Sequence, residues 1–300
     1  MSPTALEWVA RFERFLATER RMSGHTVSSY MRETAALVRF CDARGLAAWR
    51  DLDSQYIRVF AAQSHSSGLA ARSVQRRLSA VRSFFRFLIR ERVLKSNPGE
   101  DIRAPKAAHR LPHTLDPDQM ARLLELPAGG ALTARDRAMM ELFYSSGLRL
   151  AELAGLDLGD IDANDRTVRV LGKGGKARIV PVGRPALEAL ARWRVERQTL
   201  ARSDTRALFV GRSGRRLGRR AIEARVGYWA RRQGLPMHVH PHLFRHSFAS
   251  HILESSGDLR GVQELLGHAN IGTTQIYTHL DFQHLARIYD ASHPRARKKS

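Results

Sequence analysis

Two short stretches in the second half of the chain place basic side chains where they could bind a phosphate. In SSGLRLAEL, Gly147 stands where one helix should end, and Arg149 and Glu152 lie one turn apart at the start of the next. In HPHLFRHSFASHIL, a helix is predicted to begin near Pro241, and His242 and Arg245 share one face of it. Helix N-termini favour anions, so both stretches could hold a phosphate, although an Arg–Glu pair at this spacing is also a common surface ion pair.

Two further residues could take part in such chemistry. Lys173 is presented on a glycine-rich turn, LGKGGKAR, which lacks the G-x-x-x-x-G-K-[ST] spacing of a nucleotide-binding P-loop. Tyr277 stands in LLGHANIGTTQIYTHL, nine residues after His268, in a small, polar stretch that is not typical of a core. A lone tyrosine is most often a half-buried packing residue, so its position alone does not decide its role.

Six histidines between residues 238 and 268 raise the alternative of a metal site; they are His238, His240, His242, His246, His251 and His268. His242 and His246 have the i, i+4 spacing of a helical ligand pair. The H-E-x-x-H motif is absent, however, and no aspartates cluster there for two-metal phosphoryl transfer. We therefore expect no metal and no other cofactor, and a structural role for His246.

The charge balance indicates a nucleic-acid partner. The 300 residues include 50 Lys and Arg against 29 Asp and Glu, a net charge of +21. Residues 1–110 hold 20 of the basic residues and 10 of the acidic ones, so both parts of the chain are basic. Such a distribution suits a protein that grips DNA with two domains, because each neutralised phosphate releases condensed counterions.

The hydrophobic pattern predicts a mainly α-helical protein of two domains with a small β-hairpin. Helical periodicity over residues 5–94 predicts a four-helix bundle, and we expect a DNA-binding domain at 1–95, a Pro-rich linker at 96–112 and a catalytic domain at 113–300. The hairpin is expected over RTVRVLGKGGKARIVPV, on both sides of its glycine-rich turn. The catalytic domain's helices are expected near 116–126, 132–145, 149–155, 184–199, 217–233, 241–255 and 258–267.

The last helix of the bundle has one apolar and one basic face. Its apolar stripe is Val74, Leu78, Val81, Phe85 and Leu88. The basic face carries Arg72, Arg76, Arg86 and Arg90, without a balancing acid along the helix until Glu91. We interpret this face as a surface for phosphates or the major groove, rather than an ordinary solvated face.

The cysteine content and the apolar runs of the sequence indicate the cellular compartment. A single cysteine, Cys41, excludes an intrachain disulfide and fits a reducing cytosol. The N-terminal stretch MSPTALEWVARFERF does not resemble a signal peptide, and no apolar run approaches the length of a membrane span. We expect a cytoplasmic protein.

Taken in order, the candidate residues resemble the active-site set of the tyrosine site-specific recombinases, the phage integrase family. The set comprises Arg149, Lys173, His242, Arg245, His268 and Tyr277. The resemblance spans the chain, and the stretch ESSGDLRGVQELLGHANIGTTQIYTHLDFQHLARIYDASHPRA resembles the XerC branch of the family almost continuously.

The resemblance implies a mechanism without metal or ATP. Tyr277 would be the nucleophile and form a 3′-phosphotyrosyl intermediate, and Arg149 and Arg245 would clamp the phosphate. His242 would accept the phenolic proton or hold the phosphate, His268 would donate a hydrogen bond to it, and Lys173 would protonate the departing 5′-oxygen. Glu152 would support the site by orienting a basic neighbour.

The resemblance also implies partners: double-stranded DNA with a dif-like site, a XerD-like recombinase in a heterotetramer, and an FtsK-like DNA translocase. The expected biological role is resolution of chromosome and plasmid dimers during cell division. Two alternatives remain, a phage-type integrase or type IB topoisomerase-like enzyme, and a DNA-binding regulator without catalytic activity. The regulator predicts at least one eroded site position, whereas all six are present.

Overall fold

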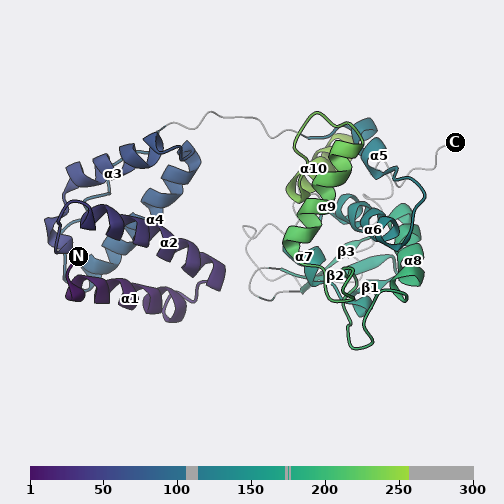
Figure 1. Cartoon of the computed structure of the whole chain (residues 1–300), viewed down its shortest axis with the longest axis horizontal. Helices are drawn as coiled ribbons and strands as arrows, with labels where there is room; N and C mark the ends of the chain where they lie inside the picture. Colours follow the sequence, from purple (N-terminus) through teal and green to yellow (C-terminus); the bar gives the residue numbers. More distant parts are fainter. Residues whose placement is uncertain (106–113, 173–174, 176, 257–300) are drawn as a thin grey trace. The chain divides into compact units, whose positions relative to one another are not determined.

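The computed structural model describes residues 1–105, 114–172, 175 and 177–256 (Figure 1). The chain divides into two compact units, residues 1–110 and 111–300, and each unit has a hydrophobic core of its own. The predicted fold class, mainly helical with a small sheet in the second unit, is confirmed. The boundaries expected for the linker stay a prediction, since residues 106–113 lie outside the described part.

The first unit contains the four α-helices expected from periodicity: α1 (Pro3–Thr18), α2 (Gly24–Asp42), α3 (Ser54–Ser66) and α4 (Ala71–Arg90). Three of them begin at a side chain that caps the helix: Ser2, Ser23 and Asp53 accept hydrogen bonds from backbone N–H groups three residues further on. A short 3₁₀ turn, η1 (Trp49–Asp51), which the sequence pattern did not predict, lies between α2 and α3.

Aromatic rings fill the core of the first unit. Phe84 on α4 lies 5.1 Å from Phe12 and 4.8 Å from Trp49, measured between ring centroids. The Trp49 indole N–H also donates to the Ala5 carbonyl at 2.7 Å, so this buried polar group is satisfied. The predicted apolar stripe of α4 is buried throughout, which fixes the direction in which its opposite face points.

The second unit surrounds a small antiparallel sheet with helices. Its elements are α5 (Pro117–Leu124), α6 (Ala131–Ser146), α7 (Leu150–Gly155), η2 (Leu158–Asp160), β1 (Ile161–Asp162), β2 (Thr167–Leu171), β3 (Ala177–Pro181), α8 (Arg184–Arg197), α9 (Arg219–Arg232) and α10 (Pro241–Ser256). Strands β2 and β3 form the predicted hairpin, with Val170 opposite Arg178. Strand β1 was not predicted because two residues are too short to show alternation. The helix expected at 258–267 lies outside the described residues.

Helix α6 is the central element of this unit and packs against α8 and α10. Phe143 on α6 lies 5.9 Å from Phe244 on α10, and both rings are fully buried together with Trp193 of α8. None of the helices in the described part of the chain is long and apolar enough to cross a membrane.

A buried carboxylate ties α6 to α9. Asp136 Oδ1 accepts hydrogen bonds from Arg135 Nε at 3.0 Å and Nη2 at 2.7 Å. Its Oδ2 accepts from Arg225 Nε at 2.6 Å and from the Trp229 indole at 2.8 Å. Arg135 in turn donates to the Val210 carbonyl at 3.0 Å. The Asp136 side chain is inaccessible to solvent, so its charge is balanced only by these donors.

We predict that Asp136→Ala lowers the free energy of unfolding of the second unit by about 3 to 5 kcal/mol, because the buried charge of Arg135 loses its counterion. Hydrogen exchange of the α6 and α9 amides in the full chain measures this loss within that unit. Glu223→Ala, which removes an exposed acid from α9, is the matched control. Equal protection in the two variants would show that the Asp136 cluster does not stabilise the unit.

Candidate active site

The junction between α6 and α7 positions Arg149. Gly147 ends α6 in the left-handed conformation, with φ of +56°, which a residue without Cβ adopts at little cost. Arg149 is the N-cap residue of α7, and Glu152 one turn later folds back onto it: its Oε2 accepts from the Arg149 backbone N–H at 2.8 Å and its Oε1 from Arg149 Nη1 at 2.9 Å. The Arg149 side chain is 38% exposed, so an anchored guanidinium also faces solvent.

Arg245 reaches the same junction from α10. Its Nη1 donates to the Gly147 carbonyl at 2.6 Å, and the residue is only 8% exposed. Burial first, and then the positive charge of Arg149, lower the pKa of Arg245 to about 10. Arg245 therefore stays protonated at neutral pH, close to a second guanidinium. An anion between the two would relieve their repulsion.

A third arginine, Arg178 on β3, belongs to this cluster and was missed in the sequence. Its Nη1 donates to Glu152 Oε1 at 2.6 Å and its Nη2 to Oε2 at 3.0 Å, and its side chain is 10% exposed. One signal could have revealed it. Strand alternation places residue 178 on the same face as buried Val180, and an arginine on an inward face needs a carboxylate partner.

The Glu152 carboxylate is charged in spite of its burial. Burial alone would raise the pKa of Glu152, but the hydrogen bond from Arg178, followed by that from the Arg149 backbone, outweighs it, so the pKa lies below its usual value. Glu152 thus acts as a permanent anion between two cations. The expectation that it orients a basic neighbour stays a prediction, and these contacts are what such a role requires.

The histidines of the region lie in different surroundings. His242 and His246, in the first turns of α10, are exposed, and the His242 ring lies 6.3 Å from that of His240. His251 is buried, and its Nδ1 shares a hydrogen bond of 2.8 Å with the Tyr144 hydroxyl. Within the described ranges, no three His, Cys, Asp or Glu side chains are grouped as metal ligands.

The remaining three members of the predicted set, Lys173, His268 and Tyr277, lie outside the described residues. The strands that flank the Lys173 turn are described: β2 ends at Leu171 and β3 begins at Ala177. The structure therefore brings together Arg149, Glu152 and Arg245, and places His242 one helical turn before Arg245.

The basic face of α4 differs from the expectation in one respect: the premise that it lacks balancing acids is wrong. Arg90 donates to both carboxylate oxygens of Glu19, the C-cap residue of α1, at 2.8 and 3.1 Å, and its guanidinium lies 4.4 Å from the centre of the Phe15 ring. Two weaker ion pairs, each 3.9 Å long, join Arg76 to Glu33 and Arg86 to Glu100. These acids come from other segments, so a count along one helix could not reveal them. Arg72 is exposed.

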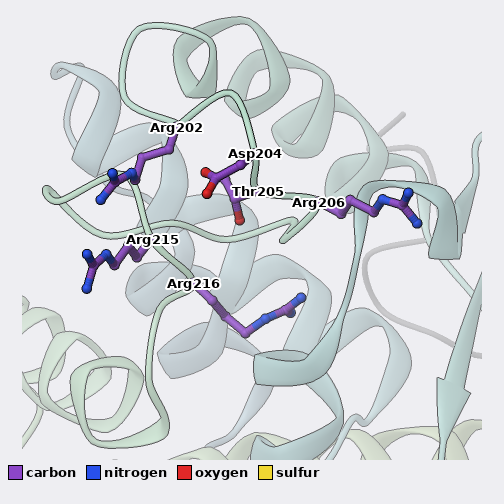
Figure 2. A pocket seen from close by; sticks show the side chains of 6 residues that line it. All are labelled: Arg202, Asp204, Thr205, Arg206, Arg215 and Arg216. Atoms are coloured by element: carbon purple, nitrogen blue, oxygen red, sulfur yellow. The ribbon is translucent and has the colours of Figure 1, made fainter.

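A second basic surface surrounds a hollow of about 540 Å³ in the loop between α8 and α9 (Figure 2). It is lined by Arg202, Asp204, Thr205, Arg206, Arg215 and Arg216. Figure 2 shows the guanidinium groups of Arg202 and Arg215 extending to the same side of the loop. Arg216 pairs with Asp157 and donates to the Leu156 carbonyl at 2.9 Å. Among the described residues, none of Arg149, His242 and Arg245 lines this hollow, so it is separate from the arginine cluster.

Both units of the chain match known protein families. The family model described as "Phage integrase family" matches residues 113–284, and "Phage integrase, N-terminal SAM-like domain" matches residues 9–92. The chain is 51% identical over 285 residues to tyrosine recombinase XerC of Actinobacillus pleuropneumoniae serotype 7 (strain AP76), covering 95% of this chain and 93% of that protein. It is also 51% identical over 294 residues to XerC of Xanthomonas campestris pv. campestris (strain B100), covering 98% and 90%.

Solved structures show the same fold. The recombinase XerH bound to a palindromic difH substrate matches with a TM-score of 0.76 at 21% identity, covering 96% of each chain. A lambda integrase (75–356) dimer bound to a COC′ core site matches with a TM-score of 0.69 at 21% identity, covering 92% of this chain and all of that one. Because the sequence match to the XerC proteins extends over nearly the whole chain, the predicted resemblance is confirmed: the chain belongs to the phage integrase family and is a tyrosine-type site-specific recombinase.

Proposed function

We propose that this recombinase cuts and rejoins DNA through a 3′-phosphotyrosyl intermediate on Tyr277, without metal or ATP. The observation that carries the proposal is the approach of two guanidinium groups, Arg149 and Arg245, to one helix junction. We infer that a single phosphate binds there and call this junction the phosphate seat. The identity of about half to XerC proteins over nearly their full length supports it.

In the proposed cleavage step, the phenolic oxygen of Tyr277 attacks the scissile phosphorus. A bond forms between that oxygen and phosphorus, the bond to the 5′-oxygen breaks, and the phosphate stays esterified to the enzyme. His242 accepts the phenolic proton or holds the phosphate, His268 donates a hydrogen bond to a phosphate oxygen, and Lys173 protonates the departing 5′-oxygen. Because one phosphodiester replaces another, the step can reverse onto a partner strand.

The two arginines supply most of the electrostatic stabilisation. Negative charge on the non-bridging oxygens grows as the phosphorus becomes pentacoordinate, and preorganised cations bind that state more strongly than the substrate. Arg245 is fixed by its bond to Gly147 and Arg149 by its bond to Glu152, so neither has to be reorganised during the reaction.

The finer biological role follows from the XerC likeness. We infer that the chain acts in the cytoplasm with a XerD-like partner, as a heterotetramer on synapsed dif-like sites, to resolve chromosome or plasmid dimers during cell division under an FtsK-like translocase. A phage-type integrase or type IB topoisomerase-like activity is the second candidate and uses the same nucleophile. We also infer that the arginines of α4 and the basic hollow near Arg202 contribute DNA phosphate contacts.

We predict that the wild-type protein forms a covalent complex with a nicked duplex that carries a dif-like site, in the presence of EDTA, and that Tyr277→Phe does not, because only the phenolic oxygen can form the ester. Denaturing gel electrophoresis detects the complex. The assay is run with this protein alone and again with a XerD-like partner, and Tyr228→Phe, on α9, serves as the matched control.

A covalent band that persists in Tyr277→Phe would show that another residue is the nucleophile. Absence of the band from wild type under both conditions, on DNA that is demonstrably bound, would favour a DNA-binding regulator without catalytic activity.

We predict that Arg245→Lys lowers the cleavage rate constant about 100-fold or more, because an ammonium cannot donate to the Gly147 carbonyl and the phosphate in the same fork geometry. DNA affinity, measured by fluorescence anisotropy, should change less than about threefold, since the positive charge is retained. Arg192→Lys, an exposed position on α8, is the control. Wild-type cleavage in Arg245→Lys would exclude Arg245 from the phosphate seat.

A further inference from the structure

We propose that Arg178 is a positioning residue for strand cleavage: through the Glu152 carboxylate, it holds Arg149 in the orientation that binds the scissile phosphate. The inference rests on the proposed function, because it assumes that Arg149 contacts that phosphate. Arg178 lies on β3, whereas Glu152 and Arg149 lie at the start of α7, so the contact joins two elements of the second unit.

The other hydrogen bonds of Glu152 leave one acceptor position on its carboxylate for the Arg149 guanidinium. A carboxylate offers about four acceptor positions, two on each oxygen. Arg178 takes one on each, through Nη1 at 2.6 Å and Nη2 at 3.0 Å. The Arg149 backbone N–H takes the second position of Oε2, at 2.8 Å, so the Arg149 side chain is left with Oε1, at 2.9 Å. The Arg149 guanidinium thus donates to Glu152 through Nη1 alone.

Loss of Arg178 would change this geometry. With two acceptor positions open, Glu152 could bind Arg149 through both oxygens, the strongest arrangement for an arginine and a carboxylate. Such a bidentate pair would turn the Arg149 fork toward the protein and away from solvent. Occupation of Glu152 by Arg178 therefore limits the Arg149 side chain to one contact with this carboxylate and fixes the orientation of its guanidinium.

The exposure of the two arginines supports this division of roles. The Arg149 side chain is 38% exposed, whereas that of Arg178 is 10% exposed. A substrate can therefore contact Arg149 directly, while Arg178 acts on it only indirectly, through Glu152. Arg178 Nε is buried and has no hydrogen-bond partner among the described residues. A pair formed through Nε and one Nη nitrogen would give Nε a partner. The observed pair uses both Nη nitrogens instead, so it binds both carboxylate oxygens and leaves Nε without a hydrogen bond in this part of the chain.

Arg178 belongs to a cluster with a net positive charge. Arg149, Arg178 and Arg245 carry three positive charges, and Glu152 carries one negative charge. The positive charges of Arg149 and Arg178 both lower the pKa of Arg245. The resulting excess of two positive charges suits a phosphodiester whose charge grows in the transition state. Arg178 meets this site through Glu152 and is only 10% exposed, so its loss should appear in the reaction rate more than in DNA affinity.

A double-mutant cycle between Arg178→Met and Glu152→Gln tests the proposal, with single-turnover cleavage of the nicked duplex at saturating enzyme as the rate measurement. We expect Arg178→Met to slow cleavage about 10- to 100-fold, the range typical when a partner that orients a site residue is lost. The dissociation constant for the duplex should change less than about threefold. In the Glu152→Gln background, Arg178→Met should slow cleavage less than about threefold, because a neutral amide cannot draw Arg149 into a bidentate ion pair.

Two matched variants accompany the cycle. Arg169→Met removes an exposed arginine from β2, where it pairs with Asp160, and should leave the cleavage rate unchanged. Arg178→Lys keeps the charge but cannot form a fork; it should slow cleavage less than Arg178→Met does, and its effect should also disappear with Gln at position 152. If Arg178→Met fails to fold, Arg178→Lys carries the same cycle.

Equal losses from Arg178→Met in both backgrounds would overturn the proposal, since Arg178 would then act independently of Glu152. Weaker DNA binding with an unchanged rate at saturation would overturn it as well, and would make Arg178 a DNA contact. Failure of the proposed function is recognised separately, because the wild-type protein would then form no covalent complex.

Discussion

The buried carboxylate of Glu152 is the interaction on which the geometry of the site depends. It lies between Arg149 and Arg178 and accepts four hydrogen bonds from these two residues. A buried anion with this many donors has few alternative positions, so it fixes the first turn of α7 and the start of β3 to each other. The same charge reduces the repulsion between guanidinium groups that would otherwise separate them.

The proposed phosphate seat combines segments that are distant in the sequence. Gly147 ends α6, turns the chain toward Arg149, and offers its carbonyl to Arg245 from α10. These segments stay together because α6 packs against α10 in the core and is tied to α9 through Asp136. Rigid packing and buried ion pairs thus hold the guanidinium groups in position before a substrate binds. Such preorganisation is the condition for electrostatic catalysis.

Much of this could be predicted from the sequence, for identifiable reasons. Helix α4 has a long periodic pattern, and the Arg149–Glu152 and His242–Arg245 spacings lie within one helical turn, so these features were found from the sequence. Arg178 was missed because its partner lies 26 residues away, and the acid that pairs with Arg90 was missed because Glu19 lies at the end of another helix. A periodic pattern gives the face of an element, whereas a pairing between elements depends on the tertiary fold.

The most direct test of the central claim compares cleavage of an ordinary scissile phosphate with cleavage of a methylphosphonate, which lacks the negative charge, by wild type and Arg149→Ala. If Arg149 neutralises that charge, the deficit of Arg149→Ala should shrink by at least about tenfold on the neutral substrate. An equal deficit on both substrates would contradict the account, because Arg149 would then support the fold or the binding of DNA without meeting the phosphate.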